Sequence, residues 1–172
     1  MVLNQKSLCW LSKSNVLLDA SLKEFFIVYQ KYIATELLSD KVDQHLLYLL
    51  RQRTALVRQQ GSYFLWSNLS VLLVLGSEKH LRKYGHQKLQ VFNPRELKNK
   101  RVNLMTETLS LVAELSRSRT ALCHAGIFKI LKNQLSKDEW LGFHGKRKFL
   151  IADYLEWVDI SQSTFDRSRG RL

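Results

Sequence analysis

Basic side chains are the residues of this chain whose type and spacing most clearly point to a chemistry. The 172 residues include 27 Lys and Arg against 15 Asp and Glu, a formal net charge of +12. Because a compact chain this basic repels itself, we expect its surface to meet polyanions, with nucleic acid as the first candidate and an anionic membrane surface as the second. The candidate phosphate contacts before the C-terminal segment are Lys79, Arg82, Lys83, Lys88, Lys98 and Arg101.

The C-terminal segment carries the most informative motif. Residues 155–167 read LEWVDISQSTFDR. They resemble the turn and recognition helix of helix-turn-helix DNA-binding proteins, of the kind found in small phage-type regulators and transposase DNA-binding domains. The resemblance implies that Val158 packs the first helix, Ile160 seats the turn on the core, and Phe165 anchors the second helix inward. Asp159 stands at the turn position that usually carries Gly.

The same resemblance gives the polar residues of this segment roles on duplex DNA. Ser161 would cap the second helix. Gln162 would pair with adenine and Arg167 with guanine in the major groove, while Ser163 and Thr164 reach phosphates or base edges. Basic residues before and after this helix would hold the phosphate backbone. The candidate contacts of the segment are Lys146, Arg147, Lys148, Ser161, Gln162, Ser163, Thr164, Arg167, Arg169 and Arg171.

The elements that must position these residues are predicted to be helices. One Pro and seven Gly are too few turn residues for a many-stranded β protein. Asn93–Glu96 and Ser136–Glu139 have the pattern of capping boxes at helix starts. We therefore expect an all-α fold, a compact helical bundle of about six to eight helices that ends in the helix-turn-helix. The predicted helices cover about 19–37, 41–59, 62–75, 93–115 and 119–135.

Two regions are expected, a helical core over 1–143 with a possible boundary near 77–93, and a basic C-terminal segment over 144–172. The most apolar stretch, Tyr63–Leu75, has 13 residues, whereas a membrane span needs about 20. We therefore interpret it as a buried core helix and expect no membrane partner. The two cysteines do not make a disulfide framework, which favours a reducing, cytoplasmic compartment.

No group of residues has the spacing of a catalytic or cofactor site. Gly-rich phosphate loops and nucleophile motifs are missing from the sequence. The adjacent Cys123 and His124 would point about 100° apart on a helix, which disfavours a shared metal. The pair Asp138-Glu139 is better explained by helix-start electrostatics. We therefore expect a non-catalytic protein that holds no metal and no cofactor.

Three functions stay open. The first is a DNA-binding regulator or mobile-element accessory protein, expected as a homodimer because helix-turn-helix proteins usually bind paired half-sites. The second is a structural subunit that holds RNA or an RNA–DNA hybrid, similar in size, helical content and charge to the small helical subunits of CRISPR effector complexes. This second function would be favoured if one continuous stripe joined the basic residues of 51–58, 79–88 and 98–101. The first, binding of duplex DNA, would be favoured if the basic residues converged within 146–171. The third is a protein–protein adaptor with a basic face.

Overall fold

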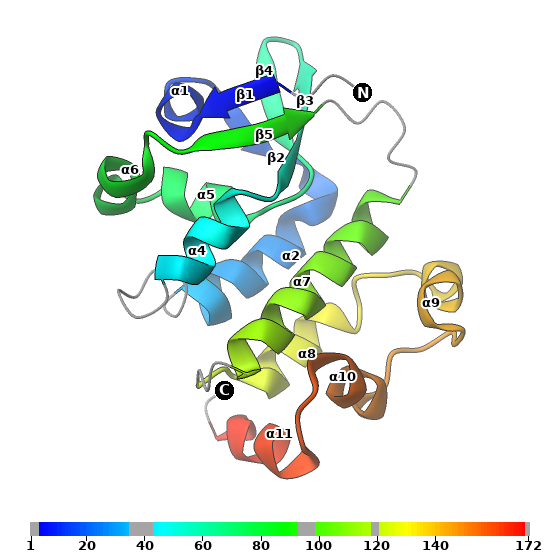
Figure 1. The fold of residues 1–172 in the computed structure, drawn as a ribbon. Coiled ribbons are helices and arrows are strands. Elements are labelled where there is room, and N and C mark those ends of the chain that lie inside the picture. The colour runs from blue at the N-terminus through cyan, green and yellow to red at the C-terminus, as the bar shows by residue number, and fades with distance from the viewer. Residues whose placement is uncertain (1–3, 35–42, 93–98, 118–120, 171–172) are drawn as a thin grey trace.

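The computed structural model describes residues 4–34, 43–92, 99–117 and 121–170. Within these ranges the chain forms a five-stranded mixed sheet together with ten α-helices, so the all-α prediction was wrong. All five strands precede residue 93, and the elements that the structure describes after it are all helices (Figure 1).

Five strands make up the sheet, β1 (Asn4–Ser7), β2 (Val16–Leu18), β3 (Arg53–Gln59), β4 (Ser62–Leu65) and β5 (Lys88–Phe92). They lie in the order β1-β5-β3-β4-β2. β1 is antiparallel to β5, β5 is parallel to β3, and β2 is parallel to β4. β3 and β4 form an antiparallel hairpin, whose turn residues Gln60 and Gly61 have φ of 48° and 81°. Positive φ at both turn positions matches the right-handed twist of the strands, and Gly adopts it without strain.

Two of the predicted helices are each divided between a strand and a shorter helix. The predicted helix 41–59 consists of α4 (Asp43–Leu50) followed by β3. The predicted helix 62–75 consists of β4 followed by α5 (Ser70–Leu75). Both segments are apolar enough for either structure, so a short apolar run does not by itself distinguish a buried strand from a buried helix.

Asn68 supplies a physical reason for the break between β4 and α5. Its φ is 58°, a left-handed conformation that Asn tolerates better than most residues. Its side-chain amide donates to the carbonyl of Leu49 at 2.9 Å and to Thr54 Oγ1 at 3.0 Å. These hydrogen bonds connect Asn68 to α4 and β3. They stabilise a non-helical backbone conformation at Asn68, so that one helix does not run through the whole segment.

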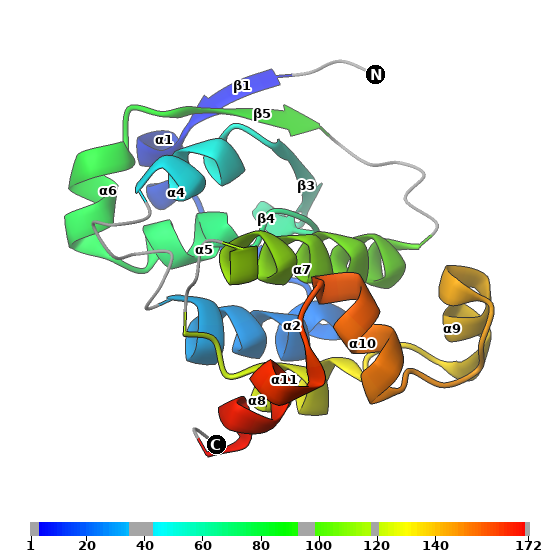
Figure 2. The same cartoon turned by 60° about the horizontal axis from the view of Figure 1, so that its bottom comes forward.

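Helices pack on one face of the sheet and extend away from it in layers (Figures 1 and 2). α1 (Leu8–Ser12), α5 and α6 (Glu78–Tyr84) contact one another. α2 (Lys23–Val28) continues through one wider turn to Ile33 and contacts α7 (Lys100–Arg117). The sheet contributes to the same hydrophobic core through the buried side chains of Leu56, Leu65, Leu89 and Val91.

Four helices complete the described chain, α8 (His124–Leu131), α9 (Lys137–His144), α10 (Ile151–Val158) and α11 (Gln162–Arg169). α10 packs against α7, and α11 packs against α8. The ring centroid of Phe128 lies 5.6 Å from that of Tyr154 and 6.0 Å from that of Phe165. An aromatic core therefore joins α8, α10 and α11.

One of the two predicted capping boxes is confirmed. Ser136 Oγ accepts a hydrogen bond from the Glu139 N–H at 3.2 Å, and the Ser136 N–H donates to Glu139 Oε2 at 2.8 Å. This reciprocal pair begins α9 and satisfies backbone donors that the helix leaves free. The other box, Asn93–Glu96, lies outside the described residues.

A buried serine connects α11 to the start of α8. Ser168 is 3% exposed, and its hydroxyl accepts from the Ala125 N–H at 3.0 Å and donates to the Phe165 carbonyl at 2.6 Å. The Ser168 carbonyl in turn accepts from Cys123 Sγ at 3.5 Å. α11 is thus held by polar contacts as well as by Phe165.

We expect Ser168→Ala to lower the free energy of unfolding by about 1–3 kcal/mol, because it leaves the buried Ala125 N–H without its acceptor. The matched control is Ser163→Ala, which removes an exposed hydroxyl from the same helix and should cost less than about 0.5 kcal/mol. Urea unfolding of both variants measures the difference. Equal losses in the two variants would show that Ser168 does not hold α11.

Candidate nucleic-acid interface

The segment from α10 to α11 has two helices joined by a three-residue turn. Asp159 ends α10 in the left-handed conformation, with φ 54° and ψ 51°. The Ile160 N–H donates to the Leu155 carbonyl at 3.2 Å, and Ser161 Oγ accepts from the Thr164 N–H at 3.2 Å. The predicted cap at Ser161 is confirmed, and Asp159 takes the conformation for which other sequences use Gly.

Side chains of α11 differ sharply in exposure. Phe165 is 2% exposed and turns inward as predicted, while Gln162, Ser163 and Arg167 are exposed. The side chain of Arg167 lies along the helix, where its Nε donates to the Ser163 carbonyl at 3.3 Å. Gln162 Nε2 donates to Asp166 Oδ2 at 3.1 Å. Exposed hydrogen bonds of this kind exchange readily with other partners, because their net contribution to stability is small.

Lys146 has a structural partner. Its ammonium forms an ion pair with Asp153, whose side chain is 6% exposed. The other carboxylate oxygen of Asp153 accepts from the Leu150 N–H at 2.8 Å. Burial alone would raise the pKa of Asp153, but the hydrogen bonds from Lys146 and Leu150 outweigh it, and the pKa lies below its ordinary value. Of the predicted basic cluster, Arg147 and Lys148 are exposed.

α6 and β5, which carry Lys79, Arg82, Lys83 and Lys88, lie well apart from α11 in both views (Figures 1 and 2). Lys79, Arg82 and Lys83 are exposed on α6, and Arg82 Nη2 lies 3.5 Å from Glu78 Oε2. Lys88 is exposed on β5. Arg101 is partly buried on α7. Arg169, at the end of α11, lies 3.5 Å from Asp166. Lys98 and Arg171 fall outside the described residues.

The structure also brings together residues that the helical prediction kept apart. Arg53 on β3 lies opposite Gln90 on β5, two residues from Lys88. Arg53 and Lys88 therefore share one sheet although 35 positions separate them in the chain. The sequence signal for this strand is the alternation of polar Lys88 and Gln90, both exposed, with apolar Leu89 and Val91, both buried.

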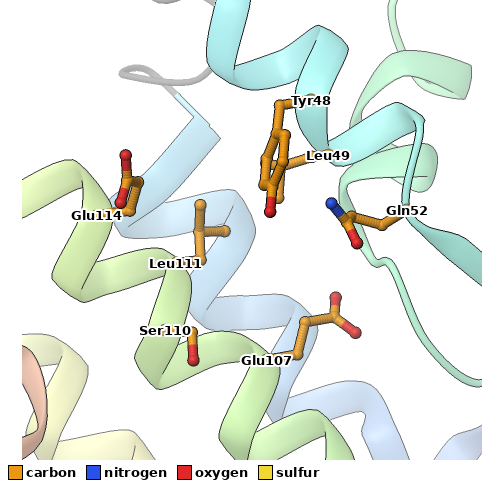
Figure 3. A pocket seen from close by; sticks show the side chains of 7 residues that line it. All are labelled: Tyr48, Leu49, Gln52, Glu107, Ser110, Leu111 and Glu114. Atoms are coloured by element: carbon orange, nitrogen blue, oxygen red, sulfur yellow. The ribbon is translucent and has the colours of Figure 1, made fainter.

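A groove of about 520 Å³ lies between α4 and α7 (Figure 3). Tyr48, 63% exposed, overhangs it from α4, and Glu107 and Glu114 line the side formed by α7. Its carboxylates would repel a phosphate backbone, so we assign it no part in contacts with nucleic acid. The residues that line the groove are Tyr48, Leu49, Gln52, Glu107, Ser110, Leu111 and Glu114.

Glu107 joins α7 to the start of α5. Its Oε2 accepts from the Asn68 N–H at 2.9 Å, and its Oε1 accepts from the Tyr29 hydroxyl at 3.3 Å. Burial raises the pKa of Glu107, and the hydrogen bonds from Asn68, Tyr29 and Leu69 compensate only in part. Burial and the neighbouring Glu107 carboxylate likewise raise the pKa of Tyr29 well above its ordinary value.

We expect the stability of the protein to fall as pH rises through the raised pKa of Glu107. The folded chain holds this proton more tightly than the unfolded chain, so the contribution is complete below the unfolded pKa and is lost above the folded one. Glu107→Gln should remove this part of the pH dependence, and Glu114→Gln, which alters the same groove, should retain it. Urea midpoints measured across mildly acidic to neutral pH compare the three proteins. An identical pH slope in wild type and Glu107→Gln would contradict the assignment.

None of the helices in the described ranges combines the length and the apolar character that a membrane crossing requires.

The chain matches none of the protein families, curated proteins or solved structures with which it was compared. Its function must therefore be inferred from its own residues.

Proposed function

We propose that this protein binds duplex DNA by placing the exposed face of α11 in the major groove. The observation that carries the proposal is the unit formed by α10, the left-handed Asp159 and the Ser161-capped α11. Recognition helices of DNA-binding proteins are set at such a turn after a supporting helix. The protein acts without catalysis, and α11 supplies the contacts that depend on base sequence.

The side chains of α11 suit this role. Gln162 at the start of α11 and Arg167 in its last turn are both exposed, whereas Phe165 between them is buried. A glutamine amide pairs with adenine and a guanidinium with guanine, and each good pair discriminates between bases by about 1–3 kcal/mol. In the free protein the Gln162 amide and the Arg167 guanidinium form hydrogen bonds to other residues of α11. These hydrogen bonds keep both side chains ordered at the helix surface, and DNA would replace them on binding.

Phosphate contacts are assigned to the exposed basic residues that flank the two helices. Arg147 and Lys148 precede α10, and Arg169 ends α11. Arg169 lies 3.5 Å from Asp166 and its guanidinium 5.6 Å from the Phe165 ring. Lys146 is committed to the buried Asp153, so its contribution to DNA binding is to hold the start of α10.

A role as a subunit of a ribonucleoprotein is the second candidate. The similarity to small helical CRISPR subunits assumed an all-helical chain, and the sheet contradicts that assumption. The convergence of Arg53 and Lys88 on the sheet nevertheless favours a surface that contacts a polynucleotide away from α11.

The test is a selection of binding sites from randomised duplex DNA by the purified chain. We expect the wild-type chain to enrich a defined motif. The double variant Gln162→Ala with Arg167→Ala should prefer that motif over other sequences about tenfold less, or lose the preference. Arg147→Gln with Lys148→Gln should weaken binding to all duplexes alike and reduce the salt slope by about 0.9 for each phosphate that the variant no longer neutralises. Enrichment of the same motif by the α11 variant, or of no motif by wild type, would refute the proposal.

A further inference from the structure

We propose that the face of the sheet turned away from the helices is a second nucleic-acid surface, which binds a single strand by stacking its bases on aromatic side chains. This inference does not depend on α11. It starts from the strand register, because residues directly paired on neighbouring strands project to the same face and side chains alternate along each strand.

One face belongs to the core and the other does not. Leu56 pairs with Leu65, and both side chains are buried in the core. Their neighbours Val57 and Phe64 pair with each other and so project to the opposite face. No described helix lies against that opposite face in either view (Figures 1 and 2). It is called the open face below.

The open face carries an apolar stripe that runs across the strands. Val57, Phe64 and Leu17 form one row of it, and Phe92 lies in the next row beside Ala55, whose small side chain is fully buried. Leu17 is 41% exposed, and Val57, Phe64 and Phe92 are partly exposed. Two aromatic rings on a solvent-facing sheet give flat surfaces on which unpaired bases can stack.

A polar and basic row borders this stripe. Gln5 pairs with Gln90, and Gln90 pairs with Arg53, so all three share the open face. Lys88 lies one step further along β5 on the same face, and all four side chains are exposed. The amides can hydrogen-bond base edges, and the two cations are placed to meet phosphates.

The charge of the sheet favours a polyanion over other occupants. None of the five described strands contains Asp or Glu. At the end of the sheet, Asp19 is paired with Lys100 at 2.7 Å, and the Lys100 ammonium lies 4.7 Å from the centre of the Trp66 ring. A second copy of the same face would oppose cations to cations with no carboxylate from the strands to pair them. A duplex keeps its bases stacked inside and offers them no contact with Phe64 or Phe92.

The experiment measures binding of labelled oligothymidine and oligouridine of about 12 nucleotides, and of a duplex of equal length, to the full chain. We expect Phe64→Leu with Phe92→Leu to weaken binding of both single strands about 5- to 100-fold and to leave duplex binding unchanged. Tyr48→Leu, which removes an exposed aromatic ring of α4, is the matched control and should have little effect.

A salt series supplies a second readout that does not depend on the aromatic variant folding. Arg53→Gln with Lys88→Gln should lower the salt slope for single strands by about 1.4, since each phosphate contact contributes about 0.7. Lys129→Gln with Lys132→Gln removes the same charge from exposed positions at the end of α8 and should leave that slope unchanged.

Three results would overturn the proposal. The first is no single-strand binding at the lowest salt, and the second is an equal effect of the sheet variants and their matched controls. The third is a dimer of the wild-type chain, seen by sedimentation, that becomes a monomer in the double variant Phe64→Leu with Phe92→Leu. A second copy would then cover the open face. The duplex measurements are read separately, so failure of the α11 proposal leaves this test intact.

Discussion

Burial of α7 around most of its circumference is the constraint on which the rest of the fold depends. Its buried side chains include the consecutive Leu111, Val112 and Ala113, whereas a helix with one partner buries a single stripe. α7 must therefore lie between two layers, and it contacts α2 on one side and α10 on the other (Figure 1). Glu107 adds a polar link from α7 to Asn68 at the start of α5. The sheet-bearing part and the C-terminal helices are thereby held together through one element.

This arrangement separates the two surfaces that we assign to nucleic acid. The open face of the sheet lies on one side of the molecule, and α11 lies beyond α8 on another (Figure 1). The chemistry of the two surfaces differs as well. α11 offers amide and guanidinium groups on a narrow helix that fits a groove, and the open face offers aromatic rings and cations on a broad sheet. A net charge of +12 favours contact with polyanions.

Local signals in the sequence were informative where a single side chain determines the backbone. Ser161 and Ser136 cap helices as predicted, and Phe165 anchors α11, because these features depend on a few neighbouring residues. The pairings of β1 with β5, β2 with β4 and β3 with β5 are non-local and were missed for that reason, whereas the β3–β4 hairpin is local and its Gly61 turn was interpreted as the end of a helix. Arg53 meets Gln90 only through the fold, and the apolar run after Tyr63 fits a buried strand and a buried helix equally well. The open face, which exists only because of that pairing, could not be predicted from the sequence.

The most direct test of the central claim, that the chain has two independent nucleic-acid surfaces, is simultaneous binding of a duplex and a single strand that carry different dyes. Two-colour sedimentation of the full chain with both ligands reports whether they travel together. Independent surfaces predict a complex that contains both ligands, with the affinity for each little changed by saturation with the other. Mutual displacement of the two ligands would mean that they share one surface, and would contradict the account.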